Sequence, residues 1–257
     1  MRLDLFLEKN NFFDSRTKAK QAIERGEILV NGRVINKSSY QINDDNVNIQ
    51  YVYNSKYVSL GGYKLEKALN DFEYNPKDLI AVDIGASTGG FTDCLLKNGV
   101  KKVYAVDLND DLLHKSLKEN DKVIEVIKNA KFINVEDFNE PIDLVVADLS
   151  FISSTIILPI ISNIIDDEKD VILLIKPQFE NDEKIKFKNG IIRDKKYQKQ
   201  ACLKVLDCAK SNNLTPIKFT TAPINRDKNV EYLILLRKNA KYNLNINEFF
   251  QKIFIFL

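Results

Sequence analysis

The stretch Val-Asp-Ile-Gly-Ala-Ser-Thr-Gly-Gly-Phe, residues 82–91, limits what this chain can fold into more than any other feature. An apolar run (79–82) enters it and an amphipathic segment (91–97) leaves it. A strand, a tight glycine turn and a helix in this order form the first unit of a nucleotide-binding α/β sheet. The sequence therefore predicts a Rossmann-like, mostly parallel sheet.

The residues of the turn separate three classes of ligand. A P-loop requires Lys and then Ser or Thr directly after its last glycine, but Gly90 is followed by Phe91 and Thr92. The dinucleotide fingerprint has a glycine where this chain has Ser87. Asp83, just before the turn, would repel a pyrophosphate, whereas its carboxylate suits a ligand with an amino group. The turn therefore favours S-adenosylmethionine (SAM).

Further residues fit such a ligand, although a glycine turn without a ligand is the alternative. Gly85 and Gly89 let the backbone approach the ligand without a Cβ, and the helix N-terminus can receive its carboxylate. Asp107 ends the next apolar run, where an acid binds ribose hydroxyls in both NAD and SAM sites. The expected contacts are Asp83, Gly85, Ala86, Ser87, Thr88, Gly89, Gly90, Phe91 and Asp107.

The composition is ordinary for a soluble protein, with 44% apolar and 29% charged residues. The net charge of +2 is too small to identify a nucleic-acid binder, so any basic surface must be local. Cys94, Cys202 and Cys208 form no CxxC pair and His114 is the single histidine, so we expect no metal site and a reducing cytoplasm. Charges from Arg2 onward argue against a signal peptide, and no apolar run approaches the ~20 residues of a membrane helix.

Residues 1–50 are predicted to form a small basic α+β unit. A short apolar helix near the start precedes a helix over 17–25, which Ser15 caps and Gly26 ends. Two short apolar runs around Asn31-Gly32 predict a hairpin. A solvated helix face would explain the charges of this unit equally well.

The order of its motifs favours a binding module instead. R-L-D-x-x-L, S-R-x-x-A and I-x-x-G-x-I-x-V-N-G, followed by Lys37, resemble the S4 RNA-binding domain. The resemblance implies contacts with RNA phosphates, which position a structured RNA without reading its sequence. The residues it implies are Arg2, Arg16, Lys18, Lys20, Arg25 and Arg33.

A linker is expected at 51–60 and a second domain at 61–257. A helix over 63–72 carries Lys64. Apolar runs at 123–126, 144–147 and 171–175 predict buried parallel strands, and a helix is predicted over 198–210. The last two strands, near 217–221 and 231–237, are expected to pair as an antiparallel edge. We expect a mobile loop at 185–194 and a helix at 249–257 that packs on the sheet.

Charged side chains follow two of these buried runs. Asp148 ends the run 144–147 and Lys176 ends the run 171–175, and a lysine there is costly to desolvate without a partner. Because the carboxyl ends of parallel strands share one edge, Asp148 could supply that partner. Glu231 begins the last strand. Surface charges at strand ends are the alternative interpretation.

The elements V-S-L-G-G-Y-K, V-D-I-G-A-S-T-G-G-F-T-D, D-L-V-V-A-D-L-S-F-I-S, I-K-P-Q-F-E and N-V-E-Y-L resemble the TlyA branch of FtsJ-like 2′-O-ribose methyltransferases. The resemblance implies SAM-dependent methylation of a cytidine 2′-hydroxyl in ribosomal RNA, with the large subunit favoured. It also places a catalytic tetrad on Lys64, Asp148, Lys176 and Glu231, and adds Asn129 and Asp148 to the cofactor contacts.

The chemistry agrees with these residue types. A 2′-hydroxyl is a poor nucleophile, and an uncharged lysine amine can take its proton. Our hypothesis makes Lys176 the base and lets the charge of Lys64 favour its neutral form, while Asp148 and Glu231 hold the amines. Because some relatives are named haemolysins, a membrane-lytic protein is one alternative; a non-catalytic RNA-binding assembly factor is another.

Overall fold

The computed structural model describes residues 1–24, 26–42, 47–51, 56–181, 187–223 and 228–241. The chain divides into two compact units, Met1–Lys56 and Tyr57–Leu257. The segment expected as a linker contributes to both, because Tyr51 ends a strand of the first unit and Tyr57, 1% exposed, packs in the core of the second. The tail predicted as a helix at 249–257 lies outside the described residues.

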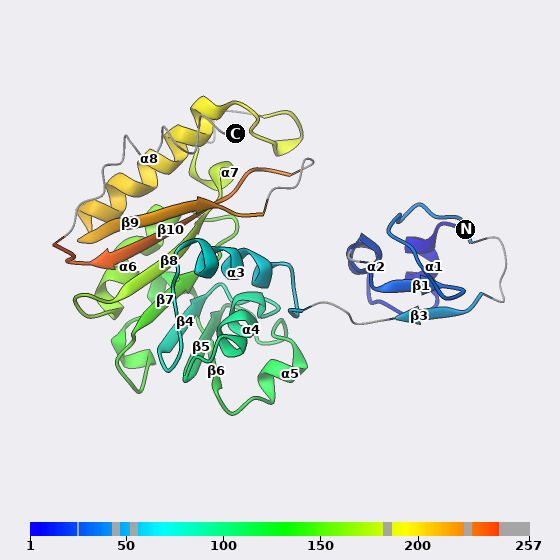
Figure 1. The fold of residues 1–257 in the computed structure, drawn as a ribbon, viewed down its shortest axis with the longest axis horizontal. Helices are drawn as coiled ribbons and strands as arrows, with labels where there is room; N and C mark the ends of the chain where they lie inside the picture. Colours follow the sequence, from blue (N-terminus) through cyan, green and yellow to red (C-terminus); the bar gives the residue numbers. More distant parts are fainter. Residues whose placement is uncertain (25, 43–46, 52–55, 182–186, 224–227, 242–257) are drawn as a thin grey trace. The chain divides into compact units, whose positions relative to one another are not determined.

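The first unit packs two helices on a small antiparallel sheet (Figure 1). The helices are α1 (Leu3–Lys9) and α2 (Arg16–Glu24), and the strands are β1 (Ile28–Val30), β2 (Arg33–Val34) and β3 (Ile49–Tyr51). Asn31 and Gly32 both have positive φ (51° and 76°), as the tight turn between β1 and β2 requires. The predicted hairpin is therefore confirmed, and β3 adds a third strand.

The second unit has a seven-stranded sheet in the order β6-β5-β4-β7-β8-β10-β9. Its strands are β4 (Ile80–Ile84), β5 (Lys102–Asp107), β6 (Val123–Ile127), β7 (Leu144–Ala147), β8 (Asp170–Ile175), β9 (Leu214–Thr221) and β10 (Tyr232–Lys238). The first five are parallel, and β10 is antiparallel to both β8 and β9. This confirms the Rossmann-like prediction.

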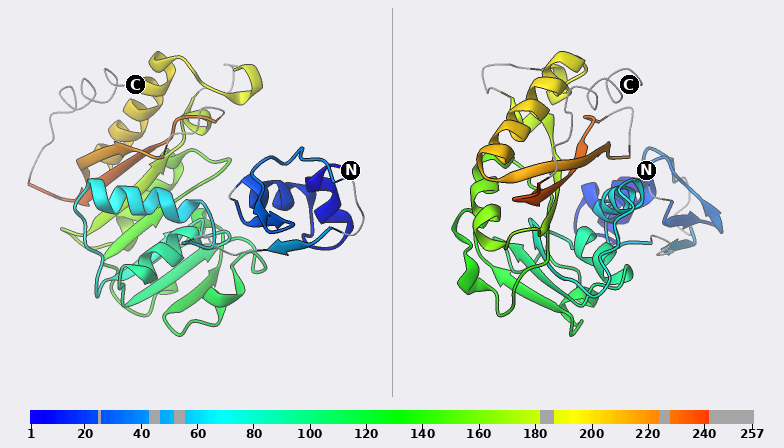
Figure 2. Two further views of the ribbon diagram at one scale, coloured as in Figure 1. Left: turned by 45° about the vertical axis from the view of Figure 1, so that its right-hand side comes forward. Right: turned by 60° about the vertical axis from the view of Figure 1, so that its left-hand side comes forward.

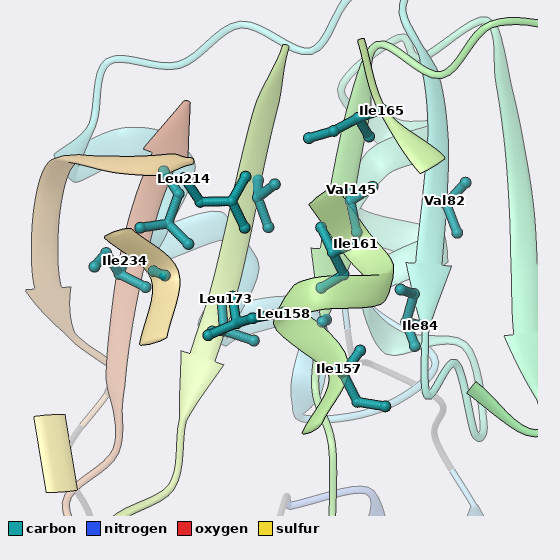
Figure 3. Close-up of a cluster of buried hydrophobic side chains, with 14 of the residues drawn as sticks. Val82, Ile84, Val145, Ile157, Leu158, Ile161, Ile165, Leu173, Leu214 and Ile234 are labelled. Carbon is teal, nitrogen blue, oxygen red and sulfur yellow. The ribbon is translucent and has the colours of Figure 1, made fainter. Parts of the chain in front are cut away.

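Helices cover both faces of this sheet, as the two views of Figure 2 show. On one face lie α3 (Gly61–Asp71) and α4 (Gly90–Lys97); on the other lie α6 (Ser154–Ile164) and α8 (Lys195–Ser211). Ile157, Leu158 and Ile161 of α6 pack among apolar side chains of the strands, which include Val145 and Leu173 (Figure 3). The shorter elements are α5 (Lys115–Lys118), α7 (Pro177–Glu180) and 3-10 turns at Ala130–Phe132, Val135–Asp137 and Lys188–Gly190. Within the described residues, no helix has the length and apolar character needed to cross a membrane.

The topology fixes where a site can form. The chain passes from β4 to β5 and β6 on one side and then returns to place β7 on the other side of β4. Ligands of such sheets bind at this reversal, outside the carboxyl ends of the strands. Because β10 is antiparallel and Tyr232 pairs with Ile175, the residue before β10 lies at the same edge as the end of β8.

Candidate active site

The glycine turn after β4 packs closely against its neighbours because two of its residues have no side chain. Gly85 and Gly89 have φ of +81° and +94°. A Cβ on Gly85 would lie 2.8 Å from the carbonyl oxygen of Asp148, and one on Gly89 would lie 2.2 Å from Cδ1 of Leu117. Both glycines are therefore needed to pack the turn against the segment after β7 and against α5, apart from any ligand.

Asp83, at the end of β4, binds the first turn of α4 through its side chain. It is fully buried, and its Oδ2 accepts hydrogen bonds from the backbone N (2.9 Å) and the Oγ1 (2.7 Å) of Thr92. Burial raises the pKa of Asp83 to about 7, with the nearby charges of Asp148 and Asp107 adding to the shift, while the bonds from Thr92 oppose it. Oδ2 of Asp83 thus anchors α4, while the buried Oδ1 has no hydrogen-bond partner among the described residues, and the contact of this carboxylate with the amino group of a ligand stays a prediction.

Asp107 ends β5 and binds the turn directly. Its Oδ2 accepts a hydrogen bond from the Ser87 backbone N at 2.9 Å, and its Oδ1 accepts one from Leu108 N at 2.7 Å. The backbone N atoms of Gly85 and Ala86 both donate to the carbonyl of Val106. The end of β5 and the turn thus form one hydrogen-bonded unit beside a half-buried carboxylate.

The other predicted cofactor residues lie in the turn, at the start of α4 or after β6. Gly89 is the N-cap of α4 and supplies no side-chain cap, and Gly90 and Phe91 form its first turn. The carbonyl of Thr88 accepts a hydrogen bond from the His114 backbone N. Asn129 follows β6, where its Oδ1 accepts from Lys131 N and caps a 3-10 turn.

Lys64 of α3 and the three charged residues predicted at strand ends lie together. Lys176 Nζ is 2.6 Å from Asp148 Oδ1, and Lys64 Nζ is 3.7 Å from Asp148 Oδ2. Lys64 Nζ is also 2.6 Å from Glu231 Oε2. All four are largely buried; the Lys176 side chain, for example, is 10% exposed. This cluster lies directly after β7 and β8, beside the glycine turn.

The charge state of Lys64 follows from its partners. Burial lowers the pKa of Lys64, but the carboxylates of Asp148 and Glu231 raise it by more, so that its net pKa lies above its ordinary value. Lys64 is therefore held as an ammonium. Asp148 is shared by both amines of the cluster, whereas Glu231 contacts Lys64.

Lys64 reaches the cluster because α3 and α4 approach closely. A Cβ on Gly90 would lie 2.9 Å from the backbone N of Gly62 and 2.2 Å from Ser59 Oγ. Only a glycine fits there, and the contact brings the first turn of α3, with Lys64, against the start of α4. The sequence placed Gly90 in the ligand turn but did not indicate this second role.

Two residues near the cluster were missed by the sequence analysis. Lys176 Nζ donates a hydrogen bond to Ser150 Oγ at 2.8 Å. Phe151 is 91% exposed with φ of +64°, and its ring centroid lies 5.3 Å from that of Phe179. The sequence shows only a serine and an aromatic residue shortly after Asp148, whereas the exposure and the left-handed backbone of Phe151 are visible only in the structure.

The residues predicted to contact RNA lie in the first unit. Arg2 and Arg16 both bind the carboxylate of Asp4. Lys18 pairs with Asp14, and Lys20 pairs with Glu24. Arg33 is exposed on β2, and Arg25 lies outside the described residues. None of the three cysteines forms a disulfide, and in the described part of the chain no group of three His, Cys, Asp or Glu residues could hold a metal ion.

The comparisons with known proteins agree with both units. Residues 57–239 match the family model of FtsJ-like methyltransferases, and residues 1–47 match that of the S4 domain. Hemolysin A of Brachyspira hyodysenteriae is 42% identical over 91% of this chain and 98% of its own length. The 23S rRNA (cytidine-2′-O)-methyltransferase TlyA of Campylobacter jejuni is 32% identical over 93% of this chain and its full length. The 16S/23S rRNA (cytidine-2′-O)-methyltransferase TlyA of Mycobacterium tuberculosis is 31% identical over 92% of this chain and 89% of its own length.

The family match over most of the chain and the relatives of similar length lead to one assignment. The chain belongs to the FtsJ-like methyltransferase family, among the members that carry an S4 domain and that are named TlyA or Hemolysin A.

Proposed function

We propose that this chain transfers the methyl group of SAM to the 2′-hydroxyl of a cytidine in ribosomal RNA. The observation that carries the proposal is the convergence of Lys64 and Lys176 on Asp148 next to the glycine turn. When bound, SAM supplies an electrophilic methyl group on a sulfonium. What the chain must add is a place for the cofactor, an acceptor oxygen held in line and a route for one proton.

The residues at the turn fit SAM. The first turn of α4 has no side-chain cap at Gly89, and although Thr92 N donates to Asp83, the N–H groups before it can receive a carboxylate. The half-buried carboxylate of Asp107 lies at the end of β5, where it can accept hydrogen bonds from ribose hydroxyls. Ser87, Thr88 and Asn129 remain proposed contacts of the cofactor on the same edge.

The proposed base is Lys176. Its neutral amine takes the proton of the 2′-hydroxyl as the oxygen attacks, which gives an ammonium that Asp148 and Ser150 stabilise by their contacts at 2.6 and 2.8 Å. Lys64 keeps its positive charge because two carboxylates surround it.

The substrate class is proposed from the relatives and the first unit. The relatives from C. jejuni and M. tuberculosis carry names that include cytidine-2′-O-methylation of rRNA, with 23S in both and 16S in one. The S4 unit supplies the basic residues that would position a structured RNA. The large subunit is therefore the expected substrate.

The proposal is tested with labelled SAM and ribosomal subunits from cells that lack the protein. We expect label in large subunits, and mapping by mass spectrometry should place it on the ribose of a cytidine. Label on a nucleobase would show that the acceptor is not a ribose oxygen and would overturn the proposed reaction. Absence of label from both subunits, with SAM binding shown by calorimetry, would favour the non-catalytic assembly factor.

A further inference from the structure

The buried carboxylate of Asp4 organises the basic surface of the first unit. Asp4 lies in the first turn of α1 and is 1% exposed. Its Oδ1 accepts hydrogen bonds from Arg2 Nε and Leu5 N, both at 3.0 Å. Its Oδ2 accepts one from Arg2 Nη2 at 3.0 Å and one from Arg16 Nε at 2.9 Å. Two arginines from different helical segments therefore meet on one acid.

The geometry leaves both arginines able to bind a second anion. Arg2 and Arg16 side chains are 43% and 49% exposed, although the acid between them is buried. Within the described residues, Arg16 contacts Asp4 through Nε, so both of its terminal nitrogens can bind another partner there, and Arg2 keeps Nη1. Because both contact the same Oδ2 atom, the two guanidinium groups lie side by side.

Two adjacent guanidinium groups repel each other, and Asp4 offsets that repulsion. Burial raises the pKa of Asp4, but Arg2 and Arg16 lower it by more, so that the net pKa lies below its ordinary value and the acid stays ionised. The lysines of α2 are held differently: Lys18 pairs with Asp14, which is 87% exposed. Such surface pairs fix a side chain only weakly.

We infer that Asp4 is a positioning residue that presents Arg2 and Arg16 together as a preformed site for one RNA phosphate. The planar fork of arginine matches the oxygens of a phosphate, and a fork already held in place loses little entropy on binding. The inference rests on the proposed RNA substrate and deepens it by naming what sets the geometry of the contact.

The inference predicts a change in RNA affinity opposite to the change that net charge alone predicts. Asp4→Asn removes a negative charge from a surface that binds an anion, so charge alone predicts tighter binding of RNA. Loss of positioning predicts weaker binding. Asp14→Asn removes the same charge from an exposed residue of the same unit and is the matched control.

The experiment measures binding of the full chain, without SAM, to large ribosomal subunits from cells that lack the protein. We expect Asp4→Asn to weaken binding about tenfold and Asp14→Asn to change it less than about twofold. Arg2→Lys keeps the positive charge at this position and leaves the contact between Arg16 and Asp4 in place. It therefore tests the inference even if Asp4→Asn does not fold. We expect it also to weaken binding, with an unchanged salt dependence.

A kinetic readout separates positioning from a general structural role. In single-turnover methyl transfer, Asp4→Asn should need more protein to reach its maximal rate, while the maximal rate itself stays that of the unaltered chain. Binding by Asp4→Asn and Arg2→Lys as tight as that of the unaltered chain, or tighter, would overturn the inference. The proposed function would then still stand, since it is judged by the methylation of the unaltered chain.

Discussion

The amines of Lys64 and Lys176 reach opposite oxygens of one carboxylate, Oδ2 and Oδ1 of Asp148, at 3.7 and 2.6 Å. Lys64 has a second acid, Glu231, at 2.6 Å. Within the described residues, the Lys64 amine therefore has two carboxylates beside it and the Lys176 amine has one. The two acids raise the pKa of Lys64, which supports its proposed role as a fixed cation and leaves Lys176 as the proposed base.

Replacement of Lys176 by alanine should reduce methyl transfer by about 100-fold or more, because the proton of the acceptor hydroxyl loses its base. Binding of SAM, measured by calorimetry, should change little. Lys169→Ala is the matched control, since Lys169 precedes the same strand at its other end and pairs with Asp143. Equal turnover of the Lys176 variant and this control would remove Lys176 from the mechanism.

Lys64 should tolerate replacement only by another cation. Because its pKa is raised by Asp148 and Glu231 against the effect of burial, its role is that of a permanent charge. Lys64→Arg should keep a measurable rate, whereas Lys64→Met, which leaves Glu231 without its cation, should lose at least about tenfold more. If single-turnover rates of the two variants were the same, charge at this position would be irrelevant.

Asp83 should make the folded state less stable as the pH rises. Its pKa is about 7 when folded and 3.8 ordinarily, so between these values the folded chain binds more protons than the unfolded chain. Stability conferred by the protonated acid is thus lost as the pH passes through about 7. Asp83→Asn should be more stable than the unaltered chain at pH 8 by ~1 kcal/mol or more, relative to their difference at pH 4. Urea unfolding that gives the same difference at both pH values would refute this.

Gly90→Ala should destabilise the second unit even though alanine favours helices. The new Cβ would meet Gly62 N at 2.9 Å and Ser59 Oγ at 2.2 Å, so we expect a loss of about 1–3 kcal/mol in urea unfolding. Gly61→Ala is the control, because a Cβ there would make only ordinary contacts, the nearest at 3.5 Å, and should change stability by less than about 1 kcal/mol. Similar stability of the two variants would show that α3 and α4 can separate without cost.

The sequence alone predicted the features that follow from the pattern of apolar residues and from the residues at the ends of the strands. Apolar runs that stop at Asp148 and Lys176 imply a shared edge, and the structure places the two charges in contact. The antiparallel pairing of the last two strands was also confirmed. These predictions succeed because each follows from residues adjacent in the chain.

Features that depend on packing between distant segments could not be predicted. Burial of Asp83 follows from how β4 lies between β5 and β7, and no local pattern distinguishes an enclosed acid from one that faces a ligand. Likewise, R-L-D and S-R are visible as motifs, but the meeting of Arg2 and Arg16 on Asp4 requires the two helices to be docked. The contact of Lys176 with Ser150 joins loops 26 residues apart.

The insertion of β10 between β8 and β9 has a consequence for biosynthesis. β9 leaves the ribosome before the strand that must bridge it to the rest of the sheet, and Glu231 emerges between these two strands. A nascent chain that already contains Lys64, Asp148 and Lys176 therefore still lacks the acid that pairs with Lys64, and the four-residue cluster is complete only after β9 has been made.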